Sequence, residues 1–164
     1  MADAGGVYVA PDEVGAPRVL DADERALLTA WVDRLVPGDG TWPPASATPA
    51  VGYIDALADR APAIVAPLRA ALGWLAERRL TSLPTEEQTA VLRDLEAHAE
   101  LGAVFRSVLE MTLEAYYRDP AVEEVVRERT GFDARRPMVG TPMAPFDPAR
   151  LDRVRALPPR YRAT

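Results

Sequence analysis

The sequence predicts an all-α protein, a compact bundle of about five to six helices with an extended, proline-rich tail at its C-terminus. Apolar residues recur at three- and four-residue spacing, helix-starting residues precede these segments, and no segment shows strand alternation that outcompetes a helix. A chain of 164 residues can build one core without disulfides or metals. We expect a flexible arm over residues 1–20, the bundle over 21–131, and a tail with one short helix over 132–164.

The first two predicted helices flank a sharp turn. Asp21 or Asp23 is expected to cap the first helix, because a side-chain oxygen there accepts a bond from an unpaired backbone N–H. This helix must end at Pro37-Gly38, since proline lacks an N–H and glycine permits a reversal. Thr48-Pro49 predicts the cap and first turn of a short second helix. The inward residues are predicted to be Leu27, Leu28, Trp31, Val32 and Leu35, then Tyr53, Ile54 and Leu57.

Prolines and acidic residues mark the next three helices. Pro62 starts the third helix, and Pro67 is either tolerated in its first turn or divides it. Pro84 precedes the fourth helix, which should stop between His98 and Gly102. The fifth has the broadest apolar stripe, so we expect it to be central. The predicted inward residues are Ile64, Leu68, Leu72 and Leu75; Val91, Leu92 and Leu95; and Val104, Phe105, Val108, Leu109, Thr112 and Tyr116, widened by Leu101, Leu113 and Tyr117.

The last bundle helix should begin at Asp119-Pro120 and end at Gly131. The chain that follows is too proline-rich for a helix and too apolar for an ordinary linker, until Asp147-Pro148 starts a short helix through Val154. Such a segment needs a surface to lie on. Two alternatives stay open: it wraps its own bundle, or it wraps a partner.

Composition and charge narrow the function classes. The absence of cysteine excludes disulfides, thiolate metal sites and covalent haem attachment. No apolar run is long enough for a membrane span and no hydrophobic segment follows Met1, so we expect a cytoplasmic protein without membrane insertion, with export alongside a signal-bearing partner left open. Residues 1–129 hold 12 arginines against 22 acids, and residues 130–164 hold 7 against 3. The acidic body argues against nucleic acid as the main partner.

No catalytic, cofactor-binding or metal-binding residue is predicted. His98 is the one histidine, and we expect it on a solvated helix end; Asp94 lies four residues before it, but two ligands do not make a metal site. Glu110 and Glu114 are neighbours on the fifth helix. If that helix is central, one of them is buried and paired with an arginine such as Arg106; an ordinary ion pair is the simpler alternative. Gly5-Gly6 precedes no strand–helix unit, so no dinucleotide fingerprint is present.

Aromatic and tail residues are the candidates for partner contact. Core and turn packing account for Trp31 and Trp42, whereas Trp74 is offset from the apolar stripe of its helix. Adjacent helical positions diverge by about 100°, so either Tyr116 or Tyr117 faces outward. The predicted partner-binding residues are Trp74, Tyr117, Met138, Val139, Met143 and Phe146.

Three segments together resemble a known family. They are the turn from Asp33 to Ala45, the helix start Tyr53-Ile54-Asp55, and the stretch from Thr112 to Pro120. In this order, over roughly residues 21–130, the chain resembles the small subunit of the flavin-dependent gluconate 2-dehydrogenase family, called subunit 3. Members of that family often carry a twin-arginine export signal, which the acidic first twenty residues here do not match.

The resemblance implies an accessory subunit that is not itself an enzyme and holds no cofactor. Its implied partner is a large FAD-dependent oxidoreductase of the glucose-methanol-choline (GMC) type, which carries the FAD and acts on sugars, sugar acids, polyols or glycosides. The small subunit would support the folding, stability or export of the large one. The alternative is a free-standing helical adaptor or regulatory protein without an oxidoreductase partner.

Overall fold

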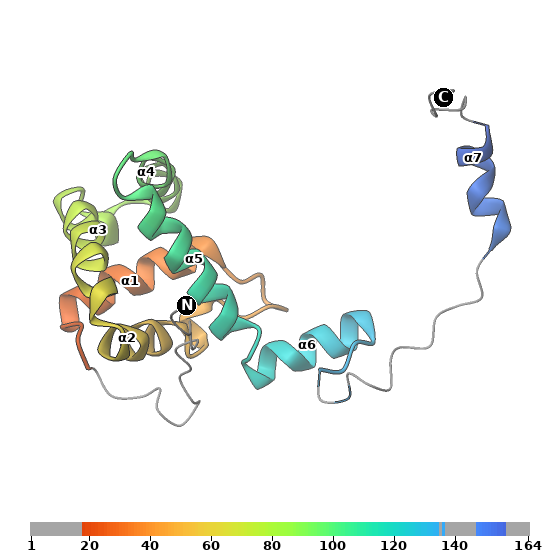
Figure 1. Ribbon diagram of the computed structural model, residues 1–164, viewed down its shortest axis with the longest axis horizontal. Helices are drawn as coiled ribbons and strands as arrows, with labels where there is room; N and C mark the ends of the chain where they lie inside the picture. Colours follow the sequence, from red (N-terminus) through yellow and green to blue (C-terminus); the bar gives the residue numbers. More distant parts are fainter. Residues whose placement is uncertain (1–17, 135, 137–146, 157–164) are drawn as a thin grey trace, which may run out of the picture.

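The computed structural model describes residues 18–134, 136 and 147–156, and these residues form helices and no strand. Six helices lie between residues 22 and 130, which confirms the predicted all-α fold (Figure 1). A single turn of 3₁₀-helix followed by a short helix, α7, lies in the C-terminal segment. The bounds are α1 Ala22–Leu35, α2 Ala50–Arg60, α3 Val65–Glu77, α4 Thr85–Ala97, α5 Gly102–Tyr116, α6 Pro120–Thr130 and α7 Asp152–Arg155.

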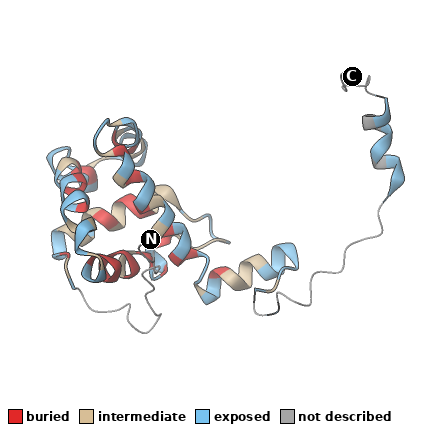
Figure 2. Ribbon diagram, viewed as in Figure 1, coloured by how far each residue is buried: buried red, intermediate tan, exposed pale blue. Residues whose placement is uncertain are grey.

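The core lies where α1 and α5 meet the other helices of the bundle. Both pack against α2, α3 and α4 and against each other, so the central position predicted for the fifth helix is confirmed and is shared with α1. Trp31 of α1 is fully buried and stacks on Phe105 of α5, with ring centroids 5.9 Å apart. Figure 2 shows the buried residues gathered on the facing sides of α1 to α5. The stripe on α5 is narrower than predicted, because Leu113 and Tyr117 are exposed.

Local signals placed most helix ends correctly. Asp21, not Asp23, caps α1: its carboxylate accepts a hydrogen bond from Glu24 N, and the Glu24 side chain accepts one from Asp21 N. Asp119 caps α6, and Gly131 ends it with a φ of 73°, a conformation that glycine adopts without strain. The fourth helix ends at Ala97, one residue before the predicted interval of His98 to Gly102, and His98 is its C-cap residue.

Two helix starts differ in detail from the prediction. Pro49, and not Thr48, occupies the cap position of α2. The Thr48 hydroxyl accepts a hydrogen bond of 3.4 Å from Ala50 N, and it donates to Ala45 O at 2.7 Å, which closes the 3₁₀ turn that precedes the helix. A second 3₁₀ turn, Pro62–Ile64, leads into α3, so Pro67 falls in the first turn of that helix and does not divide it.

The buried carboxylate of Asp55 binds the entrance segment, residues 18–20 just before α1, to the bundle. Asp55 of α2 is fully buried and accepts hydrogen bonds from the backbone N–H groups of residues 18, 19 and 20 at 2.9, 3.0 and 2.9 Å. Arg25 of α1 completes the cluster with an ion pair of 2.7 Å. Burial by itself raises the pKa of Asp55, but these hydrogen bonds and the Arg25 guanidinium outweigh it and hold the pKa below its ordinary value.

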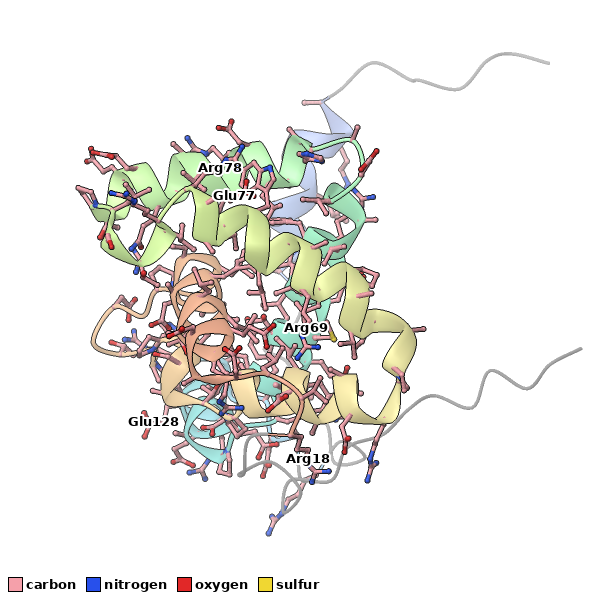
Figure 3. All side chains as sticks on the ribbon, turned by 90° about the vertical axis from the view of Figure 1, so that its left-hand side faces the viewer. Arg18, Arg69, Glu77, Arg78 and Glu128 are labelled. Carbon is pink, nitrogen blue, oxygen red and sulfur yellow. The ribbon has the colours of Figure 1, made fainter. Side chains whose placement is uncertain are left out.

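Two surface ion pairs support the same entrance segment, residues 18–20. Arg18 pairs with Asp59 of α2 at 3.1 Å. Arg69 of α3 pairs with Glu24 and also donates to Val19 O at 2.8 Å. Arg18 and Arg69 are labelled in Figure 3, which views the molecule from the side of this segment. The entrance is therefore bonded to α1, α2 and α3 at once.

Candidate partner interface

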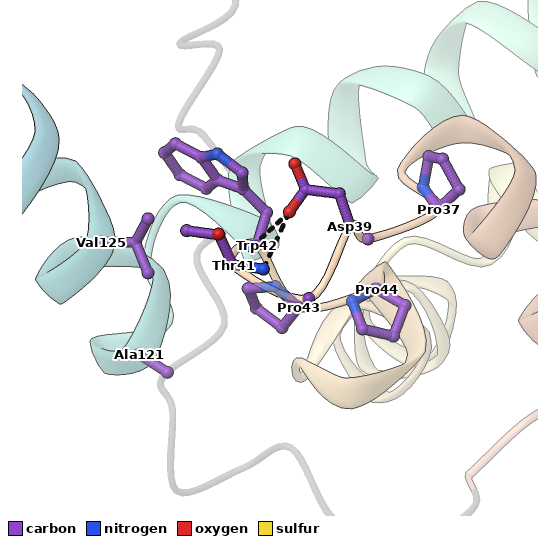
Figure 4. Close-up of a pocket in the computed structure, with 10 residues that line it drawn as sticks. Pro37, Asp39, Thr41, Trp42, Pro43, Pro44, Ala121 and Val125 are labelled. Atoms are coloured by element: carbon purple, nitrogen blue, oxygen red, sulfur yellow. Dashed lines mark hydrogen bonds between the residues drawn. The ribbon is translucent and has the colours of Figure 1, made fainter.

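Hydrogen bonds to Asp39 stabilise the turn after α1. Asp39 Oδ1 accepts hydrogen bonds from Thr41 N at 2.9 Å and from Trp42 N at 2.8 Å, and Asp39 N donates to Trp42 O (Figure 4). Gly38 and Gly40 have positive φ values of 66° and 87°. Such a conformation costs little only for glycine, so the Pro-Gly-Asp-Gly sequence sets the shape of the turn.

Neighbouring elements hold this turn in place. A Cβ on Gly38 would lie 2.7 Å from Pro44 N, so the two arms of the turn approach as closely as glycine allows. Ala45 N donates to Val36 O at 3.0 Å and closes the loop at its base. From α5, the Tyr116 hydroxyl donates to Pro43 O at 2.9 Å. The turn is thus attached to the end of α5 as well as to α1.

A groove runs between this turn and α6. We call it the Trp42 groove and define it as the hollow of about 590 Å³ lined by residues 37–44 together with Ala121 and Val125 of α6. A second hollow of about 280 Å³ adjoins it, lined by Val36, Pro37, Asp39, Trp42 and the pair Tyr116-Tyr117. Figure 4 shows the Trp42 side chain on the same side of the turn as Val125.

Electrostatics at the Trp42 groove centre on Asp39. Hydrogen bonds from the Trp42 and Thr41 N–H groups hold the pKa of this exposed carboxyl below its ordinary value, and the Arg129 guanidinium acts in the same direction. Arg129 itself donates to the Thr41 hydroxyl at 3.3 Å. Among the described residues Asp39 forms no ion pair, and Figure 4 shows its second oxygen pointing away from the turn. A negative charge is therefore presented beside the aromatic side chains.

The described residues include two of the predicted partner contacts. Tyr117 is 57% exposed and meets Tyr116 edge to face, so the pair divides into an inward and an outward ring as expected. Trp74 is half-buried: the Arg78 guanidinium lies 3.5 Å from its ring centroid, and the His98 ring contacts it edge-on. Whether they contact a partner stays a prediction. The other predicted residues, Met138, Val139, Met143 and Phe146, lie outside the described residues.

His98 differs from the solvated histidine that was expected. It is partly buried against Trp74, and its Nδ1 accepts hydrogen bonds from Glu100 N and Leu101 N at 3.2 and 3.3 Å. Its role in the described structure is to connect α4 to α5. No group of three or more histidine, aspartate or glutamate side chains suited to hold a metal ion occurs among the described residues.

Of the two alternatives for the glutamates of α5, the structure shows the ordinary ion pair and not a buried glutamate. Glu110 and Glu114 are both exposed, and Glu114 pairs with Arg118 at 3.1 Å, one turn along the helix, and not with Arg106. The buried carboxylate is Asp55, which was named above only as part of the helix start Tyr53-Ile54-Asp55 and not as a buried charge. The available signal was its position among Tyr53, Ile54 and Leu57, where a charge falls within an otherwise apolar helix.

A second groove, lined mainly by apolar residues, lies between α3 and α5. It has a volume of about 440 Å³, and its lining includes Ile64, Pro67, Val104 and Met111, with Glu110 as its charged residue. It has no aromatic side chain among its lining residues. We call it the reference groove.

Taken together, the described residues define a small all-α protein with a stiff, aromatic surface groove. The family model for gluconate 2-dehydrogenase subunit 3 matches residues 22–133, and the chain belongs to this family. The match covers every helix of the bundle and every residue that lines the Trp42 groove. Comparisons with curated proteins and with solved structures gave no match. No helix in the described parts of the chain has the length and apolar character needed to cross a bilayer.

Proposed function

We propose that this chain is a non-catalytic accessory subunit that binds and stabilises a large FAD-dependent oxidoreductase of the GMC type. The observation that carries the proposal is the family match over residues 22–133, because that family is described as a subunit of gluconate 2-dehydrogenase. The large chain would hold the FAD and oxidise a sugar, sugar acid, polyol or glycoside. This chain would contribute a binding surface and no redox centre.

The architecture suits such a role. A subunit that stabilises another chain needs a surface that is already ordered before contact, since ordering side chains on binding lowers the affinity. The turn at residues 37–44 is held by hydrogen bonds to the Asp39 carboxylate, to Val36 O at the end of α1, and from the Tyr116 hydroxyl of α5. Tyr117 extends from the end of the same helix into solvent.

Co-expression tests the proposal. A large GMC-type flavoprotein chain from the same genome should co-purify with this chain at a fixed ratio, and the amount of soluble large chain should fall when this chain is omitted. Leu28→Asp is the matched control, because it places a charge at a fully buried position and unfolds the bundle. That variant should behave like the omission.

Two other outcomes contradict the proposal. A stable monomer that leaves the yield of the flavoprotein unchanged would favour the free-standing adaptor. Flavin absorbance or turnover in the purified single chain would instead identify an enzyme.

A further inference from the structure

We infer that the Trp42 groove, together with the adjoining hollow at Tyr117, is where this chain docks on the large subunit, and that it receives an extended segment carrying a basic side chain beside a proline or aliphatic one. The inference rests on the proposed function, because only that proposal names the large subunit as the partner. What the structure adds is the surface used and the chemistry of the segment that fits it.

The first observation is the composition of the surface. Trp42 lines both the groove and the hollow beside it, and Tyr117 lines the hollow. Tryptophan and tyrosine provide large contact area with few rotatable bonds, and they are enriched among the residues that dominate binding energy at interfaces. Prolines at positions 37, 43 and 44 line the same surface. Grooves with aromatic walls are typical receptors for extended, proline-containing segments.

The second observation is that the turn at residues 37–44, which forms one wall of the groove, is held by several bonds. Both glycines of the turn have positive φ, the Asp39 carboxylate binds two N–H groups, and Pro43 O is bonded to α5. A pre-formed groove avoids the cost of ordering on association. The reference groove between α3 and α5 has neither an aromatic wall nor a comparable turn.

The third observation is charge. Asp39 presents a carboxylate oxygen that no described residue engages in an ion pair, at the edge of Trp42. An arginine or lysine of the incoming segment would pair with it. Charge also argues against a second copy of this chain, because the chain carries a net charge of −6 and two copies of like charge repel each other.

The extent of the family match argues for the large subunit over this chain's own tail. The match ends at residue 133, so it includes the groove and leaves out residues 134–164. A surface that members of the family use to bind a large subunit is expected in the part of the chain that the family model matches.

Two single substitutions test the inference in the co-expressed complex. Tyr117→Ala removes an exposed ring, and Asp39→Asn removes the charge while retaining the oxygen that accepts the Thr41 and Trp42 N–H bonds. Tyr117→Ala should release the large subunit from immobilised small subunit at least about tenfold faster than wild type. Asp39→Asn, which removes one partner of an exposed pair, should release it about two- to fivefold faster. Higher salt should accelerate release from wild type more than from Asp39→Asn, because it screens the exposed pair. Glu110→Gln is the matched control, the same neutralisation at the reference groove, and should stay within about twofold of wild type.

The possible failures are distinguishable. If wild type forms no complex, the proposed function fails and the inference fails with it. If wild type binds and both groove variants dissociate at the wild-type rate, the proposed function stands and the docking surface is wrong. Loss of a homodimer in the variants would identify a second copy as the occupant. Faster proteolysis after residue 131 in free Tyr117→Ala, with the complex unchanged, would identify the tail. Either result overturns the inference.

Discussion

Replacing Asp55 should destabilise the bundle more than any exposed charge change. Asp55→Ala leaves the N–H groups of residues 18, 19 and 20 without their acceptor and Arg25 without its partner. Hydrogen bonds to a charged group contribute about 1.5–3 kcal/mol each, and breaking a buried ion pair costs about 3–5 kcal/mol. The two contributions describe partly the same interactions, so they do not add. The Arg25 side chain is 24% exposed, so water hydrates part of its charge once the carboxylate is removed. We expect a loss of about 3–5 kcal/mol for Ala and about 2–3 kcal/mol for Asn, which keeps one acceptor oxygen.

Urea unfolding followed by circular dichroism measures this loss, and Asp59→Asn is the matched control. Asp59 lies one turn further along α2 and pairs with Arg18, but its side chain is 48% exposed. Exposed pairs of this kind contribute about 0–1 kcal/mol. If Asp55→Asn unfolds within about 0.5 kcal/mol of wild type, or if the two asparagine variants lose the same amount, the reasoning about the buried cluster is wrong.

The same cluster predicts a dependence on pH. The folded-state pKa of Asp55 is lowered, so its contribution is fully present above the unfolded-state pKa of about 3.9 and is lost as the pH falls through the folded-state pKa. The difference in unfolding free energy between wild type and Asp55→Asn should therefore be constant above about pH 5 and shrink below about pH 4. A difference that stays constant down to pH 3 would contradict this assignment.

The remaining predictions concern the α4–α5 junction and the tail. Gly102→Ala should destabilise by about 1–3 kcal/mol in urea unfolding, because its Cβ would lie 2.5 Å from Glu96 O. Gly73→Ala should raise the free energy of unfolding by about 0.5–1 kcal/mol, because its Cβ meets nothing within 4 Å on the exposed side of α3. If both substitutions change the free energy of unfolding by the same amount, the argument from the Cβ contacts is wrong. Truncation after Thr130 should weaken the complex with the large subunit while leaving the helical circular dichroism per residue of the free chain nearly intact. Melting of the truncated bundle would place the tail in the bundle's own fold.

The sequence predicted features that depend on neighbouring residues in the chain. Asp21, Asp119 and Gly131 act at helix ends through contacts within a few residues. The sequence alone locates Asp119 and Gly131, and it narrows the first cap to Asp21 or Asp23. The reversal after α1 was predicted for the same reason, since Pro37 and Gly38 determine it locally.

What could not be predicted depends on distant parts of the chain. The burial of Asp55 requires the segment 35 to 37 residues earlier, and nothing in the sequence around Asp55 says which N–H groups it will meet. The Trp42 groove likewise exists only because α6 leaves α5 in a direction that brings Val125 opposite the turn. The sequence left the face of Glu110 and Glu114 open, because it does not show how wide the buried side of α5 is; both residues lie outside it.

The binding of the entrance segment to Asp55 has a consequence for amide hydrogen exchange. The amides of Val19 and Leu20 precede the first helix, yet their protons point at a buried carboxylate and do not face water. Protection from exchange reports the free energy needed to open such a bond, whatever the secondary structure around it. Slow exchange should therefore begin at least three residues ahead of Ala22, so the cooperatively folded unit extends beyond its helices.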